Sequence, residues 1–296
     1  MKVDCNICRF YSFWMWALLD YLKLIRAINC IIAAAAVLIG AYFTWTSTVY
    51  YAPVMSAIAA FLVCAAGNVV NDIVDIDIDL INQPQRVLPA GDISKSAATK
   101  LAIALTVVAV IVALAINWQV LSAVMLAIAL LALYNFKAKK IPIFGNSIIA
   151  LLGALTFITG GLAVDESLTF ALPGPVIPAL FAFFFHLARE ILKDVEDIEG
   201  DRRVGIKTFP QVVGESRAML AVLVLFFIMV VLTFIPVLAG WFGRAYEILT
   251  IYIIDLPLLL LLIFIWGNPS RKMLRIGSLG LKAGMLLGIV ALIVAR

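Results

Sequence analysis

The chain has 296 residues, of which 65% are hydrophobic and 14% are charged, and its mean hydropathy is +1.11. Soluble globular domains are about 45–50% apolar and about 25% charged, so this composition excludes that class and indicates an integral membrane protein. Nothing in the formal net charge of +4 calls for a nucleic-acid partner.

The N-terminal region before the first long apolar run is rich in aromatic residues. Its stretch RFYSFWMWALLDYLKLIR is interrupted by Asp20, Lys23 and Arg26. It lacks the basic region and the small-residue cleavage site of a signal peptide. We therefore expect residues 1–20 to form an interfacial segment at the membrane surface.

Nine apolar runs follow. A hydrocarbon core about 30 Å thick takes about 20 apolar residues per helix. The expected spans cover residues 22–44, 51–71, 97–116, 119–136, 144–164, 169–190, 217–240, 246–266 and 274–295. Little of the chain is left for a soluble domain, so we expect a single transmembrane domain over residues 1–296.

Lysine and arginine gather in every second connection between these spans. The opposite connections hold almost none, Arg244 being the exception. Basic loops mark the cytoplasmic side, so we expect a multi-pass protein of the cell membrane whose N-terminus and acidic stretches face the cytoplasm. The basic residues are Arg86, Lys95, Lys137, Lys139, Lys140, Lys193, Arg202, Arg203, Lys207, Arg271, Lys272 and Arg275.

Two acidic stretches end the second and sixth spans. The first is NDIVDIDID, residues 71–79, and the second lies within REILKDVEDIEGDRRVGIKTFP, residues 189–210. A carboxylate at the centre of a bilayer costs roughly 2.5–3.5 kcal/mol, so these acids call for a function. Both contain three aspartates with the same spacing, and each aspartate of the second set lies 122 residues after its counterpart in the first. The chain therefore looks like two related halves.

The spacing of these aspartates indicates a metal site. At about 100° per residue, helix positions i, i+3 and i+7 lie within about 60° of one another, so each triplet forms one face if its span continues as a helix. Mg²⁺ prefers such oxygen ligands, and the only histidine, His186, cannot build a zinc site with these cysteines. Asn68 and Asn71 add neutral oxygens. The expected metal ligands are Asn71, Asp72, Asp75, Asp79, Asp194, Asp197 and Asp201.

Basic residues follow both acidic stretches. Arg86 follows the first, and Arg202 and Lys207 follow the second. Carboxylates that hold a metal ion, beside arginine and lysine that hold phosphate oxygens, suit a diphosphate ligand. The alternative is that these loops are simply solvated and that their charges only set the topology.

The two stretches resemble the motifs of the UbiA superfamily of intramembrane prenyltransferases. The family pattern NDxxDxxxD is matched by Asn71, Asp72, Asp75 and Asp79. The second pattern, DxxDxxxD with a trailing glycine and basic residues, is matched by Asp194, Asp197, Asp201, Gly205, Lys207 and Thr208. The resemblance covers nearly the whole chain and implies an all-α integral membrane protein with about nine transmembrane helices around a central cavity.

The resemblance also implies a mechanism. Two Mg²⁺ ions would bridge the aspartates to a prenyl diphosphate, with its isoprenoid tail in a groove that faces the membrane lipids. The metal and basic side chains would stabilise the departing diphosphate, and a lipid-like acceptor would capture the allylic group. The implied catalytic residues are Asp75, Asp79, Asp197 and Asp201. The implied substrate-binding residues are Arg26, Asn29, Asn68, Arg86, Tyr134, Lys137, Lys193, Arg202 and Lys207, whereas Lys139 and Lys140 look like topology charges.

The acceptor is left open by the motifs. The stretch KDVEDIEGDRRVGIKTFP looks most like the archaeal lipid enzymes of the family, which join a geranylgeranyl chain to a hydroxyl of geranylgeranylglyceryl phosphate. An aromatic-acid polyprenyltransferase of quinone biosynthesis, of the 4-hydroxybenzoate type, would share the same motifs. A cation transporter would also place carboxylates in a membrane, but transporters carry polar residues and broken helices near the midplane, whereas these acids lie at one edge beside arginines.

Overall fold

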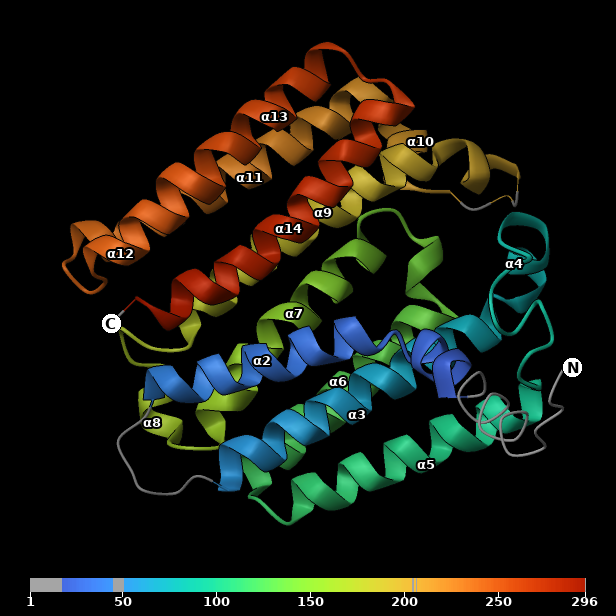
Figure 1. Cartoon of the computed structure of the whole chain (residues 1–296), viewed down its shortest axis with the longest axis horizontal. Coiled ribbons are helices and arrows are strands. Elements are labelled where there is room, and N and C mark those ends of the chain that lie inside the picture. Colours follow the sequence, from blue (N-terminus) through green and yellow to red (C-terminus); the bar gives the residue numbers. More distant parts are fainter. Residues whose placement is uncertain (1–17, 45–50, 204, 206, 296) are drawn as a thin grey trace, which may run out of the picture.

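The computed structural model of the chain describes residues 18–44, 51–203, 205 and 207–295, and all regular secondary structure in this part is helical (Figure 1). The interfacial segment expected over residues 1–20 lies almost wholly outside the described residues. Only its last three residues can be compared with the expectation, and they are helical.

Nine long helical segments make up the described part of the bundle, and the all-helical fold expected from composition is confirmed. Short helices connect the long ones: α4 (Ile76–Asn82), η1 (Ala138–Lys140), α8 (Glu166–Thr169) and α10 (Phe209–Val213). The long segments are α2 (Ala27–Thr44), α3 (Tyr51–Val74), α5 (Lys95–Leu114), α6 (Trp118–Phe136), α7 (Phe144–Leu162), α9 (Val176–Arg203), α11 (Glu215–Leu238), the continuous run of α12 (Arg244–Glu247), the π-helix η2 (Ile248–Asp255) and α13 (Leu256–Gly267), and α14 (Arg271–Ile293).

Eight of these nine segments, all but α9, are long and apolar enough to cross a membrane. The sixth expected span, residues 169–190, is displaced. α9 begins only at Val176, because proline disfavours helical backbone in the residue before it and the sequence LPGP precedes the helix. α9 then continues to Arg203, and the charged residues of its second half shorten its apolar run. It still lies inside the bundle, packed on α7, α11 and α14.

The packing repeats between the two halves of the chain. α3 packs on α2 and α5 in the first half, and α9 packs on α7 and α11 in the second. This correspondence follows the 122-residue offset of the acidic motifs, and α14 is left as an additional helix. α4 and α10 lie at one end of the molecule, and α8 and α12 lie at the opposite end (Figure 1).

The halves meet where α2 crosses α7 with its backbone in close contact. A Cβ atom added at Gly160 of α7 would lie 1.9 Å from the carbonyl oxygen of Val37, and one added at Gly40 of α2 would lie 1.9 Å from that of Phe157. Small residues permit such close crossings in membranes, where helices associate by tight packing. The two glycines therefore set the separation between the halves.

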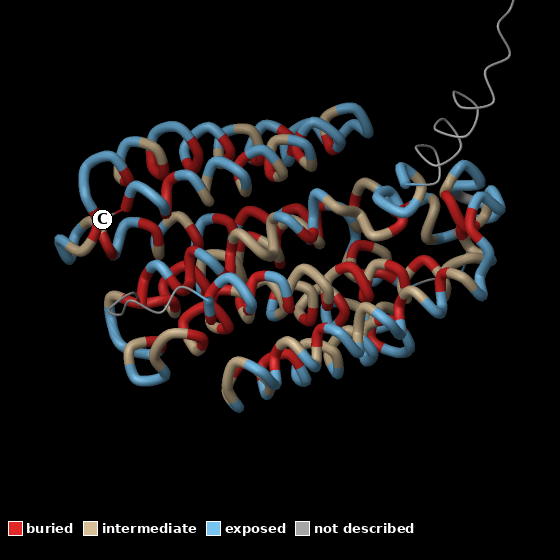
Figure 2. The backbone as a smooth tube through the Cα atoms, turned by 60° about the horizontal axis from the view of Figure 1, so that its bottom comes forward, coloured by how far each residue is buried: buried red, intermediate tan, exposed pale blue. Residues whose placement is uncertain are grey.

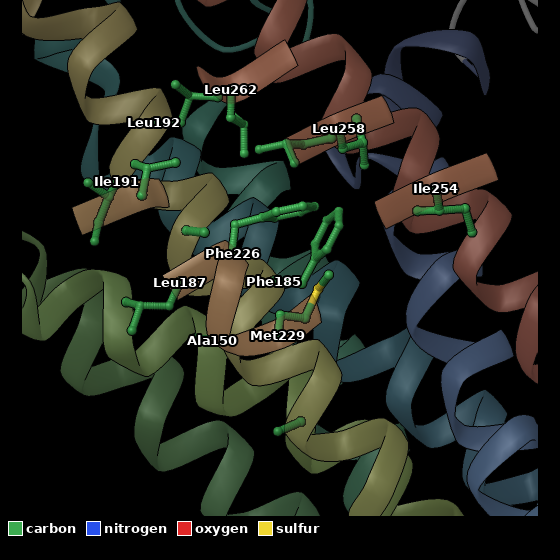
Figure 3. Packing of buried hydrophobic residues seen from close by; sticks show 14 of the residues in the cluster. Ala150, Phe185, Leu187, Ile191, Leu192, Phe226, Met229, Ile254, Leu258 and Leu262 are labelled. Carbon is green, nitrogen blue, oxygen red and sulfur yellow. The ribbon is translucent and has the colours of Figure 1, made fainter. Parts of the chain in front are cut away.

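Buried side chains fill the second half around α9. Figure 3 shows Phe185, Phe226 and Met229 close together, with Leu258 and Ile254 nearby. The rings of Phe185 and Phe226 lie 6.1 Å apart between centroids, within the range of favourable aromatic pairs. Exposed residues cover the outside of the bundle (Figure 2), and many are large and apolar, which suits contact with lipid.

We expect Gly160→Ala to destabilise the protein by about 1–3 kcal/mol, because the new methyl group forces apart two backbones that already touch. Gly267→Ala is the matched control, since a Cβ there meets nothing within 4 Å. Thermal unfolding of the purified protein in detergent measures both effects. Equal melting temperatures for the two variants would contradict the crossing described above.

Candidate active site

The two acidic motifs lie at the same end of the bundle, where α4 and α10 are found (Figure 1). The first motif does not follow one straight helix. Asp72 belongs to α3 and Asp79 to α4, while Asp75 sits at the bend between them with φ −92° and ψ 4°. The second motif does run along one helix, in the last part of α9. The second motif thus lies along one helix, as expected for a single carboxylate face. The first motif is divided by the bend between α3 and α4.

Two arginines pair with the ends of the first motif. The guanidinium of Arg26, at the start of α2, lies 2.5 Å from Oδ1 of Asp72. Arg86, in the loop after α4, lies 2.6 Å from Oδ2 of Asp79 and 3.8 Å from Asp72. Both aspartates are buried, so these pairs offset the cost of removing the carboxylates from solvent.

The central aspartate of the first motif pairs with a residue that the sequence analysis had assigned to topology. Asp75 contacts the ammonium of Lys139, which lies in η1, and the side-chain amide of Asn71 donates to it. Lys137, which the resemblance had indicated, is exposed and has no ion pair among the described residues. The sequence KAKK offers three similar lysines, and only the tight turn of η1 selects Lys139.

The second motif has a different environment. Asp194 accepts a hydrogen bond of 2.9 Å from Nδ2 of Asn146, at the start of α7. Within the described part of the chain, no lysine or arginine lies within 4.0 Å of Asp194, Asp197 or Asp201. Burial raises the pKa of Asp194 to about 7, and burial followed by the charge of Asp197 raises that of Asp201 to about 6. These carboxylates lack a cation, unlike those of the first motif.

Asn146 was missed in the sequence, where a polar residue opening an apolar span was its only signal.

The motifs are joined by a small hollow of about 50 Å³. Lys139, the partner of Asp75, lines it together with Asp194 of the second motif and Lys207 from the connection between α9 and α10. Tyr134, at the end of α6, lies in the same wall. Two lysines and two carboxylates, Asp194 and Glu190, thus line this hollow, so an anion could bind the lysines there if a cation offset the carboxylates.

The aspartates of the two motifs can hold Mg²⁺ only together with a bound phosphate ligand. No group of three or more carboxylate, imidazole or thiol side chains converges on a common point in the described part of the chain. Mg²⁺ is usually held by one or two carboxylates together with waters and substrate phosphates. Aspartates from either motif could therefore hold the ion jointly with a diphosphate, and the all-oxygen ligands match its preference.

A larger cavity of about 430 Å³ extends from this end into the bundle. Ligand pockets are commonly about 300–1,000 Å³, so it can take a sizeable ligand. Along α9 it runs from Lys193 to Pro178, about 22 Å at about 1.5 Å per residue. Its walls beyond the motif end are mainly apolar. The expected site residues that line it are Arg26, Asn29, Asn68, Asn71, Tyr134 and Lys193.

The other expected site residues lie outside this cavity. Asp75, Asp79, Asp197 and Asp201 lie beyond its motif end and line neither hollow. Arg202 is exposed and also lines neither.

Asn68 lies in the wall of the large cavity, where its side-chain amide donates a hydrogen bond of 2.9 Å to the carbonyl of Ile25. It therefore fixes the turn that places Arg26.

The model of the UbiA prenyltransferase family matches residues 28–276 of this chain. The chain belongs to this family. Its activity is therefore the transfer of prenyl groups, which rules against the cation transporter considered above. Membership also confirms the resemblance seen in the two aspartate motifs.

Several relatives align over nearly their full length. The digeranylgeranylglyceryl phosphate synthase of Methanopyrus kandleri is 35% identical over 273 residues, which cover 92% of this chain and 97% of that protein. The enzyme of the same name from Thermococcus kodakarensis is 34% identical over 280 residues, with 93% and 97% covered.

Solved structures show the same fold. A structure reported for digeranylgeranylglyceryl phosphate synthase in membranes is 33% identical, with a TM-score of 0.76, and covers 94% of this chain and 98% of that one. A UbiA homologue from Archaeoglobus fulgidus bound to GPP and Mg²⁺ is 22% identical, with a TM-score of 0.62, and covers 93% and 100%. The chain is a multi-pass membrane protein like these.

We expect Lys139→Met to lower kcat/KM for the prenyl donor by about 10–100-fold, because a charge-assisted contact of about 1.5–3 kcal/mol is lost at the hollow between the motifs. Lys140→Met is the matched control, since this neighbour is exposed and has no ion pair in the described chain. Steady-state kinetics of both variants measure the difference. The role given to Lys139 would be wrong if the two variants behaved alike.

Proposed function

We propose that this prenyltransferase transfers a geranylgeranyl group from its diphosphate to the hydroxyl of geranylgeranylglyceryl phosphate, which makes an archaeal ether-lipid precursor. The observation that carries the proposal is the identity of 33–37% with several archaeal digeranylgeranylglyceryl phosphate synthases. These alignments cover 85–93% of this chain.

The donor diphosphate is proposed to bind between the motifs. The uncompensated carboxylates of the second motif and the paired carboxylates of the first would hold two Mg²⁺ ions against the diphosphate, as the family resemblance implies. The homologue from Archaeoglobus fulgidus with GPP and Mg²⁺ supports this ligand class. Bound Mg²⁺ would neutralise the diphosphate and stabilise it as a leaving group. Lys139 and Lys207 would contact its oxygens directly.

The isoprenoid tail is proposed to lie in the large cavity between the helices, in place of the lipid-facing groove that the resemblance implies. The walls that follow the motif end are mainly apolar, for example at Ile32, Leu155 and Phe181, so they favour a hydrocarbon chain over water. This placement leaves the first carbon of the tail beside the motifs. The ether forms as the bond between this carbon and the diphosphate oxygen breaks and the acceptor hydroxyl loses its proton.

The acceptor is proposed to bind at the charged end as well. It carries a phosphate of its own, so it needs cations beyond those that hold the diphosphate. Lys193 lines the cavity at this end, and Arg202 lies about two and a half turns further along α9. An aromatic acid would not need this second group of cations.

We expect purified protein given geranylgeranyl diphosphate and Mg²⁺ to prenylate geranylgeranylglyceryl phosphate and to leave 4-hydroxybenzoate unchanged. EDTA should abolish the product and added Mg²⁺ should restore it, because carboxylates and a diphosphate repel each other unless a cation lies between them. Mass spectrometry of the products checks both statements. A prenylated benzoate would favour the quinone-precursor alternative, and full turnover in EDTA would contradict the metal-dependent site.

The charged end is proposed to face the cytoplasm, as the basic residues of its loops indicate. In a cysteine-free background, Ala90→Cys should react with an impermeant thiol reagent only from the cytoplasmic side. Ala171→Cys, exposed at the opposite end near α8, should react only from the outside. Labelling of intact cells and of inverted vesicles measures the orientation, and the reverse pattern would invert it.

A further inference from the structure

The far end of the large cavity contains polar side chains that the proposed mechanism does not use. Thr233 of α11, Thr250 and Asp255 of η2 all line the cavity and are all buried. Thr233 lies in the last two turns of α11 and Tyr246 in α12, and α12 lies at the end of the bundle opposite α4 and α10 (Figure 1). A cavity whose walls beyond the motif end are mainly apolar thus also contains carboxyl and hydroxyl groups from α11 and η2, which we name the polar end: Thr233, Thr250 and Asp255.

The π-helix explains why two of these residues share a face. In a π-helix the hydrogen bonds join residues five apart, and the amide of Leu256 donates to the carbonyl of Ile251 in this manner. Thr250 and Asp255 are also five apart and therefore lie one turn above each other. In an α-helix they would point about 140° apart. The irregular helix thus turns both side chains into the cavity.

The side chains of the polar end find only some of their hydrogen-bond partners within the protein. The hydroxyl of Thr233 lies 2.6 Å from Oδ2 of Asp255, and it can also donate to the carbonyl of Val230 at 2.7 Å. The hydroxyl of Thr250 is buried and has no hydrogen-bond partner among the described residues. A hydrocarbon chain offers no donor or acceptor, so a chain pressed against these atoms would leave them unsatisfied.

We propose that the polar end limits the length of the isoprenoid tail, so that the donor tail stops where Thr250 and Asp255 begin. This inference rests on the proposed prenyl diphosphate donor. The cavity of about 22 Å along α9 is comparable in length to an extended geranylgeranyl chain. One further isoprene unit would have to cover the carboxyl group of Asp255. The polar end therefore discriminates against longer donors, while geranylgeranyl diphosphate fills the apolar part.

The test is competition binding to the purified full-length protein with Mg²⁺ and without any acceptor. Labelled geranylgeranyl diphosphate is displaced by unlabelled geranylgeranyl or farnesylgeranyl diphosphate, and the ratio of the two Kd values is measured. Asp255→Leu should shift this ratio toward the longer donor by about tenfold or more, because an added apolar group is worth at least that in a matching pocket. Thr233 keeps the carbonyl of Val230 as its acceptor in this variant.

Three further variants separate the effect of polarity from the effect of packing. Asp255→Asn keeps a polar group at the same place and should retain the preference for geranylgeranyl diphosphate. Tyr252→Phe removes a hydroxyl from the exposed face of the same π-helix, outside the cavity, and should match the wild type. Thr250→Val replaces the hydroxyl by a methyl group of similar size, and it should shift the ratio of Kd values in the same direction as Asp255→Leu. If Asp255→Leu does not fold, Thr250→Val tests the length limit in its place.

The outcomes are distinct. An unchanged ratio in folded Asp255→Leu, or in Thr250→Val if only that variant folds, would overturn the length limit and leave the proposed function standing. Absence of displacement by either diphosphate in the wild type would overturn the proposed donor and the length limit with it. Because no acceptor is present, a wrong acceptor in the proposed function does not affect the result.

Discussion

Pairing between carboxylates and cations at one end of an apolar bundle is the interaction on which the rest of this structure depends. Arg26, Arg86 and Lys139 come from three separate segments and converge on the aspartates of α3 and α4. The pairs therefore fix the start of α2, the loop after α4 and the turn at η1 around one motif. Removing one member of a buried pair leaves an uncompensated charge and typically costs about 3–5 kcal/mol. The first half of the site is thus held in place before any ligand binds.

The second motif has the same aspartate spacing as the first, but its electrostatic environment is the opposite. Its aspartates lie along one regular helix and have no lysine or arginine partner within 4.0 Å among the described residues. Burial raises the pKa of Asp194 and of Asp201, so a bound cation would relieve an existing electrostatic cost. A duplicated sequence has therefore produced two unlike walls: one is built around internal ion pairs, and the other is left to receive a cation with its ligand.

Much of this arrangement could be predicted because it depends on patterns that are local in the sequence. Hydropathy predicted nine spans, of which eight correspond to helices long and apolar enough to cross a membrane, and the repeated aspartate spacing indicated both the family and the two halves. The contribution of Lys139 could not be predicted, since it depends on a turn that brings η1 to a residue 64 positions earlier. The bend at Asp75 and the late start of α9 depend on backbone geometry and on the prolines before Val176. The polar end depends on a π-helical register, which side-chain periodicity does not reveal.

We infer that the two motifs form a single site, although their helices belong to different halves of the chain. A double-mutant cycle with Asp79→Asn and Asp201→Asn tests it most directly, with turnover measured under saturating Mg²⁺ and thermal unfolding as the control for folding. Residues that act as a unit are strongly non-additive, so the account predicts that each single variant loses most of the activity and that the double variant is little worse than either. Losses that simply multiply, or full activity in either single variant, would contradict it.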